Sequence, residues 1–171
     1  MGRQELLSDV VAHVRRHGVG DLSLRELAEL IGSSHRMLLY HFGSREGLLA
    51  AIVAENEARE RATAVAYGRT GTSAVDALRT TWRRLRQPAH AGEERLFFEL
   101  AAMAMYGRPG TERVADDLVG SWVGPAKPVG SDAAQLRLDI AVIRGLLLDL
   151  LVTADRKGTD AAFEQYLRLR G

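Results

Sequence analysis

The stretch of sequence that decides the fold runs from residue 24 to residue 48 and reads LRELAELIGSSHRMLLYHFGSREGL. Ser23, directly before it, can cap a helix, and Glu26 completes a capping box three residues later. The apolar residues that follow recur at helical spacing, and Gly32 ends the helix after about two turns. The start of the stretch therefore predicts one short helix with a single buried face.

A second short helix is expected directly afterwards. Ser33 or Ser34 caps this helix, which runs to about Phe42 before Gly43 breaks it. Ser44 can then cap a further, longer helix. Two short helices joined by a glycine-containing turn form a helix-turn-helix, in which the second helix can lie in the major groove of DNA.

The start of the second helix carries side chains that suit a DNA-reading helix, namely Ser34, His35 and Arg36. An arginine such as Arg36 can bond both O6 and N7 of guanine, and His35 can donate to bases or phosphate. Arg25 lies at the end of the first helix that would approach the DNA backbone. Arg45, with the free amides at the start of the next helix, forms an anion site suited to phosphate.

The charge balance provides no global attraction to nucleic acid. The chain has 171 residues, with 23 Lys and Arg against 22 Asp and Glu, so affinity for DNA must come from local arrangement. Acidic and basic residues also cancel over residues 1–47, although four of the five histidines lie there and can add charge when protonated: His13, His17, His35 and His41. On the pattern alone, DNA binding and a helix-turn-helix that serves packing only are equally good interpretations.

Several function classes receive no support from the sequence. The chain has no cysteine, which excludes disulfides, cysteine-ligated metals and thiol catalysis. It has no phosphate-binding loop, nucleophile elbow or His-Glu-x-x-His motif, so we expect neither an enzyme nor a cofactor. His13 and His17 are spaced as a ligand pair, but no third ligand is evident and no metal is expected. No apolar stretch is long enough for a membrane span, and the lack of a signal peptide favours the cytoplasm.

The rest of the sequence predicts helices and no strand, giving an all-α protein of about nine helices. The expected C-terminal helices cover residues of about 74–87, 93–106, 111–123, 132–155 and 159–170. The helix over 132–155 is apolar on two sides, one with Ile140 and Leu147 and the other with Leu138 and Leu146. Such a helix is either buried on both sides or packs a partner on one of them.

The quoted stretch resembles the DNA-binding domain of the tetracycline-repressor (TetR) family. The matching features are, in order, Leu27-Ala28, Gly32, Ser34, Tyr40-His41-Phe42, Ser44-Arg45-Glu46 and Leu48-Leu49. The resemblance covers about the first third of the chain. It implies a three-helix helix-turn-helix DNA-binding domain over residues 1–47 and a helical ligand-binding and dimerisation domain over residues 48–171.

The resemblance also implies roles for particular residues. The expected base contacts are Arg25, His35, Arg36 and Met37, and the expected phosphate contacts are Ser23, Ser34, Tyr40, His41 and Arg45. For His41, a packed histidine bonded to the backbone is an equal alternative. The sequence departs from the family at Leu39, where a phosphate-contacting tyrosine is common, and at Gly43, where a lysine is usual.

The function that the resemblance implies is a homodimeric transcriptional regulator, more often a repressor, which binds a near-palindromic operator in double-stranded DNA and responds to a small apolar effector. The candidate effector contacts are Trp82, Phe97, Tyr106 and Arg144. The candidate dimer contacts are Leu136, Ile140, Ile143, Leu147, Phe163 and Tyr166. The alternatives are a helical protein-interaction module and a regulator without a small-molecule inducer.

Overall fold

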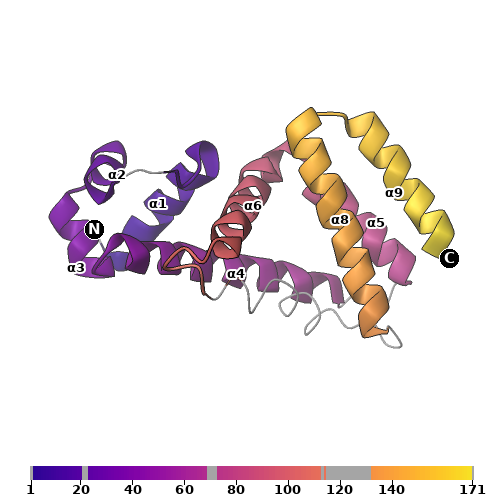
Figure 1. Cartoon of the computed structure of the whole chain (residues 1–171), viewed down its shortest axis with the longest axis horizontal. Coiled ribbons are helices and arrows are strands. Elements are labelled where there is room, and N and C mark those ends of the chain that lie inside the picture. Colours follow the sequence, from indigo (N-terminus) through magenta and orange to yellow (C-terminus); the bar gives the residue numbers. More distant parts are fainter. Residues whose placement is uncertain (1, 21–22, 69–72, 113, 115–131, 171) are drawn as a thin grey trace. The chain divides into compact units, whose positions relative to one another are not determined.

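The computed structural model describes residues 2–20, 23–68, 73–112, 114 and 132–170. Over these residues the chain forms eight α-helices and one short 3-10 helix, and it contains no strand (Figure 1). The expected all-α fold is therefore confirmed. The helix expected over residues 111–123 falls almost entirely outside the described residues.

The four N-terminal helices are α1 (Arg3–His17), α2 (Leu24–Leu30), α3 (His35–Phe42) and α4 (Arg45–Gly68). The capping box at the start of α2 is present: the Ser23 hydroxyl accepts from the Glu26 N–H at 3.2 Å, and the Glu26 carboxylate accepts from the Ser23 N–H at 2.8 Å. Ser34, rather than Ser33, caps α3. The glycines that end α2 and α3 both have positive φ, which a residue with a side chain rarely adopts.

The chain divides into two compact units. The first comprises residues 1–58 and 95–117, and the second comprises residues 59–94 and 118–171. Two helices, α4 and α6 (Ala91–Met105), contribute residues to both units. The expected domain boundary after residue 47 lies in the first turn of α4.

The first unit has an apolar core built from one face of each N-terminal helix. Its most deeply buried side chains come from α1, α3, α4 and α6, and they include Leu6, Val10, Leu38, Val53 and Leu96. The buried residues of α1 recur every three or four positions, as expected for a helix with one buried side. The guanidinium of Arg3 lies 5.2 Å from the ring centre of Phe42, so α1 also contacts the end of α3.

In the second unit, α8 (Ala133–Thr153) and α9 (Arg156–Arg170) form a hairpin that packs with α5 (Ala74–Leu85). The 3-10 helix (Pro88–His90) lies between α5 and α6 in the sequence. Trp82 of α5 stacks on Phe163 of α9, with ring centres 5.1 Å apart. The indole N–H of Trp82 donates to the Asp160 carboxylate at 2.8 Å, so this buried polar group has a partner. None of the described helices is both long and apolar enough to cross a bilayer.

A buried carboxylate joins the two helices of the hairpin. Asp139 on α8 accepts hydrogen bonds from the Tyr166 hydroxyl, from Gln135 at 3.0 Å and from the Arg170 guanidinium at 2.9 Å. Its burial is tolerated because these donors satisfy the charge. Burial, followed by the hydrogen bond and the negative charge of Asp139, raises the pKa of Tyr166 to about 12.

We predict that Tyr166→Phe lowers the free energy of unfolding by about 1 kcal/mol at neutral pH, because Asp139 loses one donor and keeps two. The folded pKa of about 12 lies above the ordinary tyrosine pKa of about 10. Wild type therefore loses stability as the pH rises through this range, whereas the variant has no phenol to ionise. Urea unfolding should show the stability difference shrinking above pH of about 10. A constant difference would contradict the contact with Asp139.

The turn between α8 and α9 contains a strained residue. Ala154, which caps α8, has φ of 59° and ψ of 13°, the left-handed conformation that glycine adopts more easily. We predict that Ala154→Gly raises the free energy of unfolding by about 0.5–1 kcal/mol, because relief of strain outweighs the added chain entropy. Ala162→Gly, an exposed position inside α9, should lower it by about 1 kcal/mol. If urea unfolding showed the same change in the free energy of unfolding for both variants, Ala154 would not be strained.

Candidate nucleic-acid interface

Helix α3 has one buried side and one exposed side. Leu38 and Phe42, one turn apart, are 0% and 8% exposed, and they anchor the helix in the core of the first unit. His35 and Arg36 lie exposed in the first turn, and Tyr40 is 79% exposed. The anchors therefore fix which side of α3 faces outward, and that side carries the predicted base-reading residues. Met37 is half-buried at the edge of this surface.

The exposed start of α2 lies in the same unit. Ser23 is bonded to Glu26, and these hydrogen bonds hold the pKa of Glu26 below its ordinary value. Arg25 lies 3.5 Å from the Glu29 carboxylate, and both side chains are largely exposed. Exposed ion pairs of this kind contribute little stability, so Arg25 can exchange its partner for a phosphate or a base at small cost.

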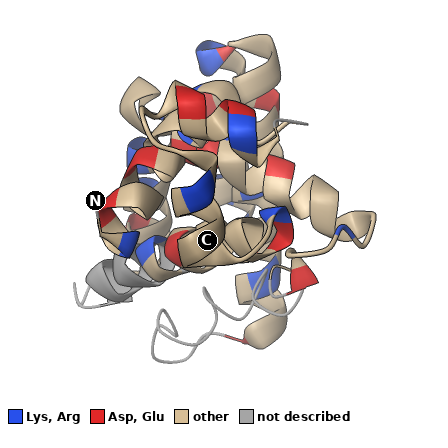
Figure 2. Ribbon diagram, turned by 90° about the vertical axis from the view of Figure 1, so that its left-hand side faces the viewer, with Lys and Arg blue, Asp and Glu red and all other residues tan. Residues whose placement is uncertain are grey.

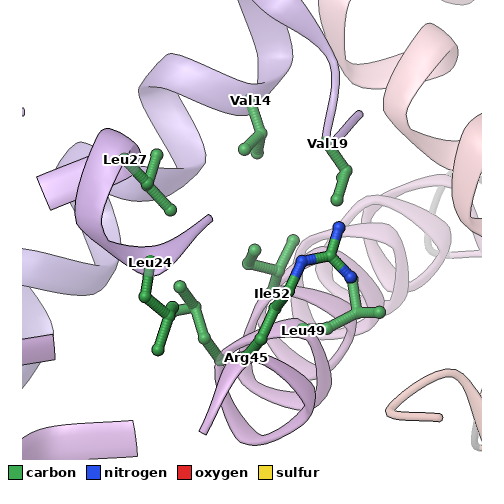
Figure 3. Close-up of a pocket in the computed structure, with 8 residues that line it drawn as sticks. Val14, Val19, Leu24, Leu27, Arg45, Leu49 and Ile52 are labelled. Carbon is green, nitrogen blue, oxygen red and sulfur yellow. The ribbon is translucent and has the colours of Figure 1, made fainter. Parts of the chain in front are cut away.

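Arg45 is placed differently from the expected phosphate contact. Its guanidinium donates to the Gly20 carbonyl at 2.8 Å, and Figure 3 shows the group turned toward Val19. The side chain lines an apolar hollow between α1, α2 and α4, with about 20 Å³ of free volume, room for one water. In this conformation Arg45 supports the loop between α1 and α2. Its contact with phosphate stays a prediction.

His41 lies at the edge of the buried side of α3. Its ring meets the Tyr40 ring edge-on at 4.9 Å, and its Nε2 atom is enclosed by protein. Within the described residues this atom has no hydrogen-bond partner. The enclosure of Nε2 argues against donation to phosphate through that atom in this conformation, and no bond from it to the backbone is present among the described residues. The role of His41 stays a prediction.

Acidic and basic residues are interspersed along the described helices rather than gathered into one basic face (Figure 2). On the described helices that this view shows, no run of basic residues forms the continuous stripe of proteins that bind DNA chiefly by charge. The described residues also bring together no group of three side chains that could hold a metal ion. Recognition of DNA by this unit would depend on the few side chains that α2 and α3 present.

The four candidate effector contacts do not share one compact unit. Trp82 and Arg144 lie in the second unit, and Phe97 and Tyr106 lie in the first. Trp82 is 3% exposed and bonded to Asp160, whereas Tyr106 is 82% exposed. Phe97 is half-buried and packs edge-on against Phe98 at 5.3 Å. Trp82 thus has a structural role in the core, and effector binding by these residues stays a prediction.

Most of the candidate dimer contacts are buried within a single chain. Ile140, Ile143, Leu147 and Phe163 are at most 8% exposed, and the Tyr166 hydroxyl is bonded to Asp139. Leu136 is half-buried. The second apolar side expected for α8 carried Leu138 and Leu146; Leu138 is 51% exposed, whereas Leu146 is half-buried. The structure also exposes Leu148 and Val152, at 47% and 78%, which the sequence analysis did not single out.

The fold and the exposed side of α3 define a helix-turn-helix protein with a C-terminal helical domain. Residues 12–52 match the sequence model of the family described as bacterial regulatory proteins, tetR family. No curated protein matches the chain. The N-terminal segment is therefore similar to the DNA-binding segment of the tetR family, and the resemblance expected from the sequence is confirmed.

Solved structures show the same fold over nearly the whole chain. A Rhodococcus sp. protein described as a TetR-family transcriptional regulator superposes with a TM-score of 0.74 at 23% identity, covering 98% of this chain and 97% of that one. A transcriptional regulator from Rhodococcus sp. Rha1 gives 0.76 at 16% identity, covering 99% and 95%. The multidrug binding protein EbrR, complexed with imidazole, gives 0.74 at 23% identity, covering 98% and 88%.

Proposed function

We propose that this protein is a transcriptional repressor that reads a near-palindromic operator as a homodimer. The observation that carries the proposal is the orientation of α3. Its buried anchors, Leu38 and Phe42, turn the exposed His35 and Arg36 outward at the capped start of the helix. This is the end of a recognition helix that contacts base edges in helix-turn-helix complexes.

Each exposed residue has a chemical role in this proposal. Arg36 forms two hydrogen bonds with a guanine, and His35 donates to a neighbouring base or phosphate. The Tyr40 hydroxyl, farther along the same exposed side, donates to a phosphate oxygen. Arg25 leaves its exposed pairing with Glu29 and approaches the DNA from α2. Phosphate contacts set the position of the helix, and the base contacts determine the sequence that is read.

The dimer is proposed to form through the exposed side of α8. Leu138, Ala141, Gly145, Leu148 and Val152 are all exposed and follow one another in steps of three and four residues. At 3.6 residues per turn this stripe lies opposite the buried Ile140, Ile143 and Leu147. The small residues allow a second copy of the helix to approach closely. Exposed leucines and valines in a continuous stripe mark an interface, and a two-fold dimer requires such a self-complementary surface.

A small apolar effector is supported by the likeness of the fold to the multidrug binding protein EbrR. Phe97 and Arg144 are both half-buried, but they belong to different compact units, so each is proposed only as a separate candidate for contact with an effector. The burial of Trp82 against Phe163 and Asp160 favours the alternative, a regulator whose central aromatic residues only pack. A thermal-shift screen with apolar compounds separates the two, because an effector raises the midpoint of unfolding.

We predict that Arg36→Ala reduces discrimination at one base pair in each half-site by about 1–3 kcal/mol. Arg16→Ala is the matched control, because it removes the same charge from an exposed position on α1. Competition titrations against single-base variants of a bound duplex measure both. The control should leave the base preference unchanged. Unchanged preference with Arg36→Ala would contradict the base-reading role.

We predict that the double variant Leu148→Arg, Val152→Arg is a folded monomer, because like charges would face each other across the two-fold axis and both positions are exposed within the chain. Ser8→Arg, an exposed position on α1, should remain dimeric. Sedimentation gives the mass of each variant, and circular dichroism verifies the fold. A dimer that survives the double substitution would place the interface elsewhere.

A further inference from the structure

The loop after α1 is held by a carboxylate from a distant part of the sequence. Glu99, on α6, accepts hydrogen bonds from the backbone N–H of Val19 at 2.9 and 2.8 Å and from the N–H of Gly20 at 2.9 Å. Gly18 and Gly20 have φ of 82° and 49°, and this conformation turns successive N–H groups toward one side, where they can bind an anion. A Cβ on Gly18 would lie 3.1 Å from the Glu99 carboxylate. Glycine at position 18 therefore suits this contact, because it adopts the positive φ and leaves room for the carboxylate.

The same loop is also bonded to α4, through the backbone carbonyl of Gly20. The Gly20 carbonyl accepts from the Arg45 guanidinium at 2.8 Å, while the Gly20 N–H donates to Glu99. One residue thus links α6 with the first turn of α4. Both proposed DNA-contacting helices are close to these two residues in the sequence. The cap of α2, Ser23, lies three residues after Gly20, and α3 ends at Phe42, three residues before Arg45.

A second close approach joins the turn after α6 to the start of α4. Gly110 has φ of 91°, and a Cβ placed there would lie 2.6 Å from the Glu46 carbonyl and 3.1 Å from the Leu49 side chain. The turn after α6 therefore approaches the start of α4 as closely as a glycine permits. All of these residues belong to the first compact unit. The part of α6 beyond residue 95 is therefore built into the helix-turn-helix unit.

We propose that Glu99 is a positioning residue for DNA reading, an inference that rests on the proposed function. The carboxylate fixes the backbone of Val19 and Gly20. Through the Gly20 carbonyl it also fixes Arg45, a proposed phosphate contact. Without it, a loop with two glycines samples many conformations, and DNA binding must order it. The resulting loss of affinity is the same for every DNA sequence, because no base contact changes.

The sign of the effect separates positioning from simple electrostatics. Glu99 is negatively charged, and removing an acidic residue from a DNA-binding unit by itself strengthens attraction to the phosphates. A positioning role instead makes the neutral variant bind more weakly. The slope of affinity against salt stays unchanged, because the number of phosphates contacted by basic residues is the same.

The experiment uses the full chain with Glu99→Gln, which keeps the shape and removes the charge. Asp9→Asn is the matched control, because Asp9 is an exposed acid on α1 in the same unit. Fluorescence anisotropy with a duplex bound by wild type, at several salt concentrations, measures affinity and slope. We expect about fivefold weaker binding for Glu99→Gln, which corresponds to ordering about one residue of backbone. The control should bind as wild type or slightly more tightly.

Hydrogen exchange tests the contact independently of DNA. The amides of Val19 and Gly20 should exchange faster in Glu99→Gln, while those of α9 keep their wild-type rates. Wild-type affinity for DNA in the variant would overturn the positioning role and leave the proposed function standing. A wild-type protein that binds no duplex would overturn the proposed function and the DNA role of Glu99 together, even with faster exchange in the loop.

Discussion

The structure of the first unit depends on the apolar core that α1, α2, α3 and α4 share. Neither α2 nor α3 is long enough to be stable alone, since isolated helices of this length are marginal in water. Their stability comes from burying side chains such as Leu27 and Leu38 against the longer helices. The same burial sets the rotation of α3 about its axis. The outward direction of His35 and Arg36 is thus a consequence of packing, and the proposed recognition of DNA follows from it.

The packing of the second unit depends on which side of α8 is buried, because this helix has one apolar side inside the chain and another that is exposed. One side, with Ile143 and Leu147, packs inside the chain, and the other carries the exposed stripe around Leu148. Asp139 fixes this division, because its carboxylate is buried and bonded to two residues of α9. Rotation of α8 would remove a buried charge from its donors, which is strongly unfavourable. The exposed stripe is therefore held on the outer side of α8, where the proposed dimer would use it.

The sequence predicted the features that are determined locally. The capping box at Ser23, the glycine that ends α2 and the approximate bounds of α2 and α3 depend on residues a few positions apart, and the structure has them where they were expected. The sequence did not show which side of α8 is buried or that Trp82 is bonded to Asp160, because these depend on contacts with distant elements. Glu99 is the clearest case, since its partners lie 79 and 80 positions away and are backbone groups with no sequence signature.

The central claim is that the protein reads DNA as a dimer with α3 at each half-site. The most direct test is to select bound duplexes from a random pool at near-physiological salt and to sequence them. The account predicts enrichment of an inverted repeat whose half-sites lie about one helical turn or more apart. No enrichment, even at lowered salt and with the protein shown to be folded, would contradict it and would leave a helix-turn-helix that serves packing only.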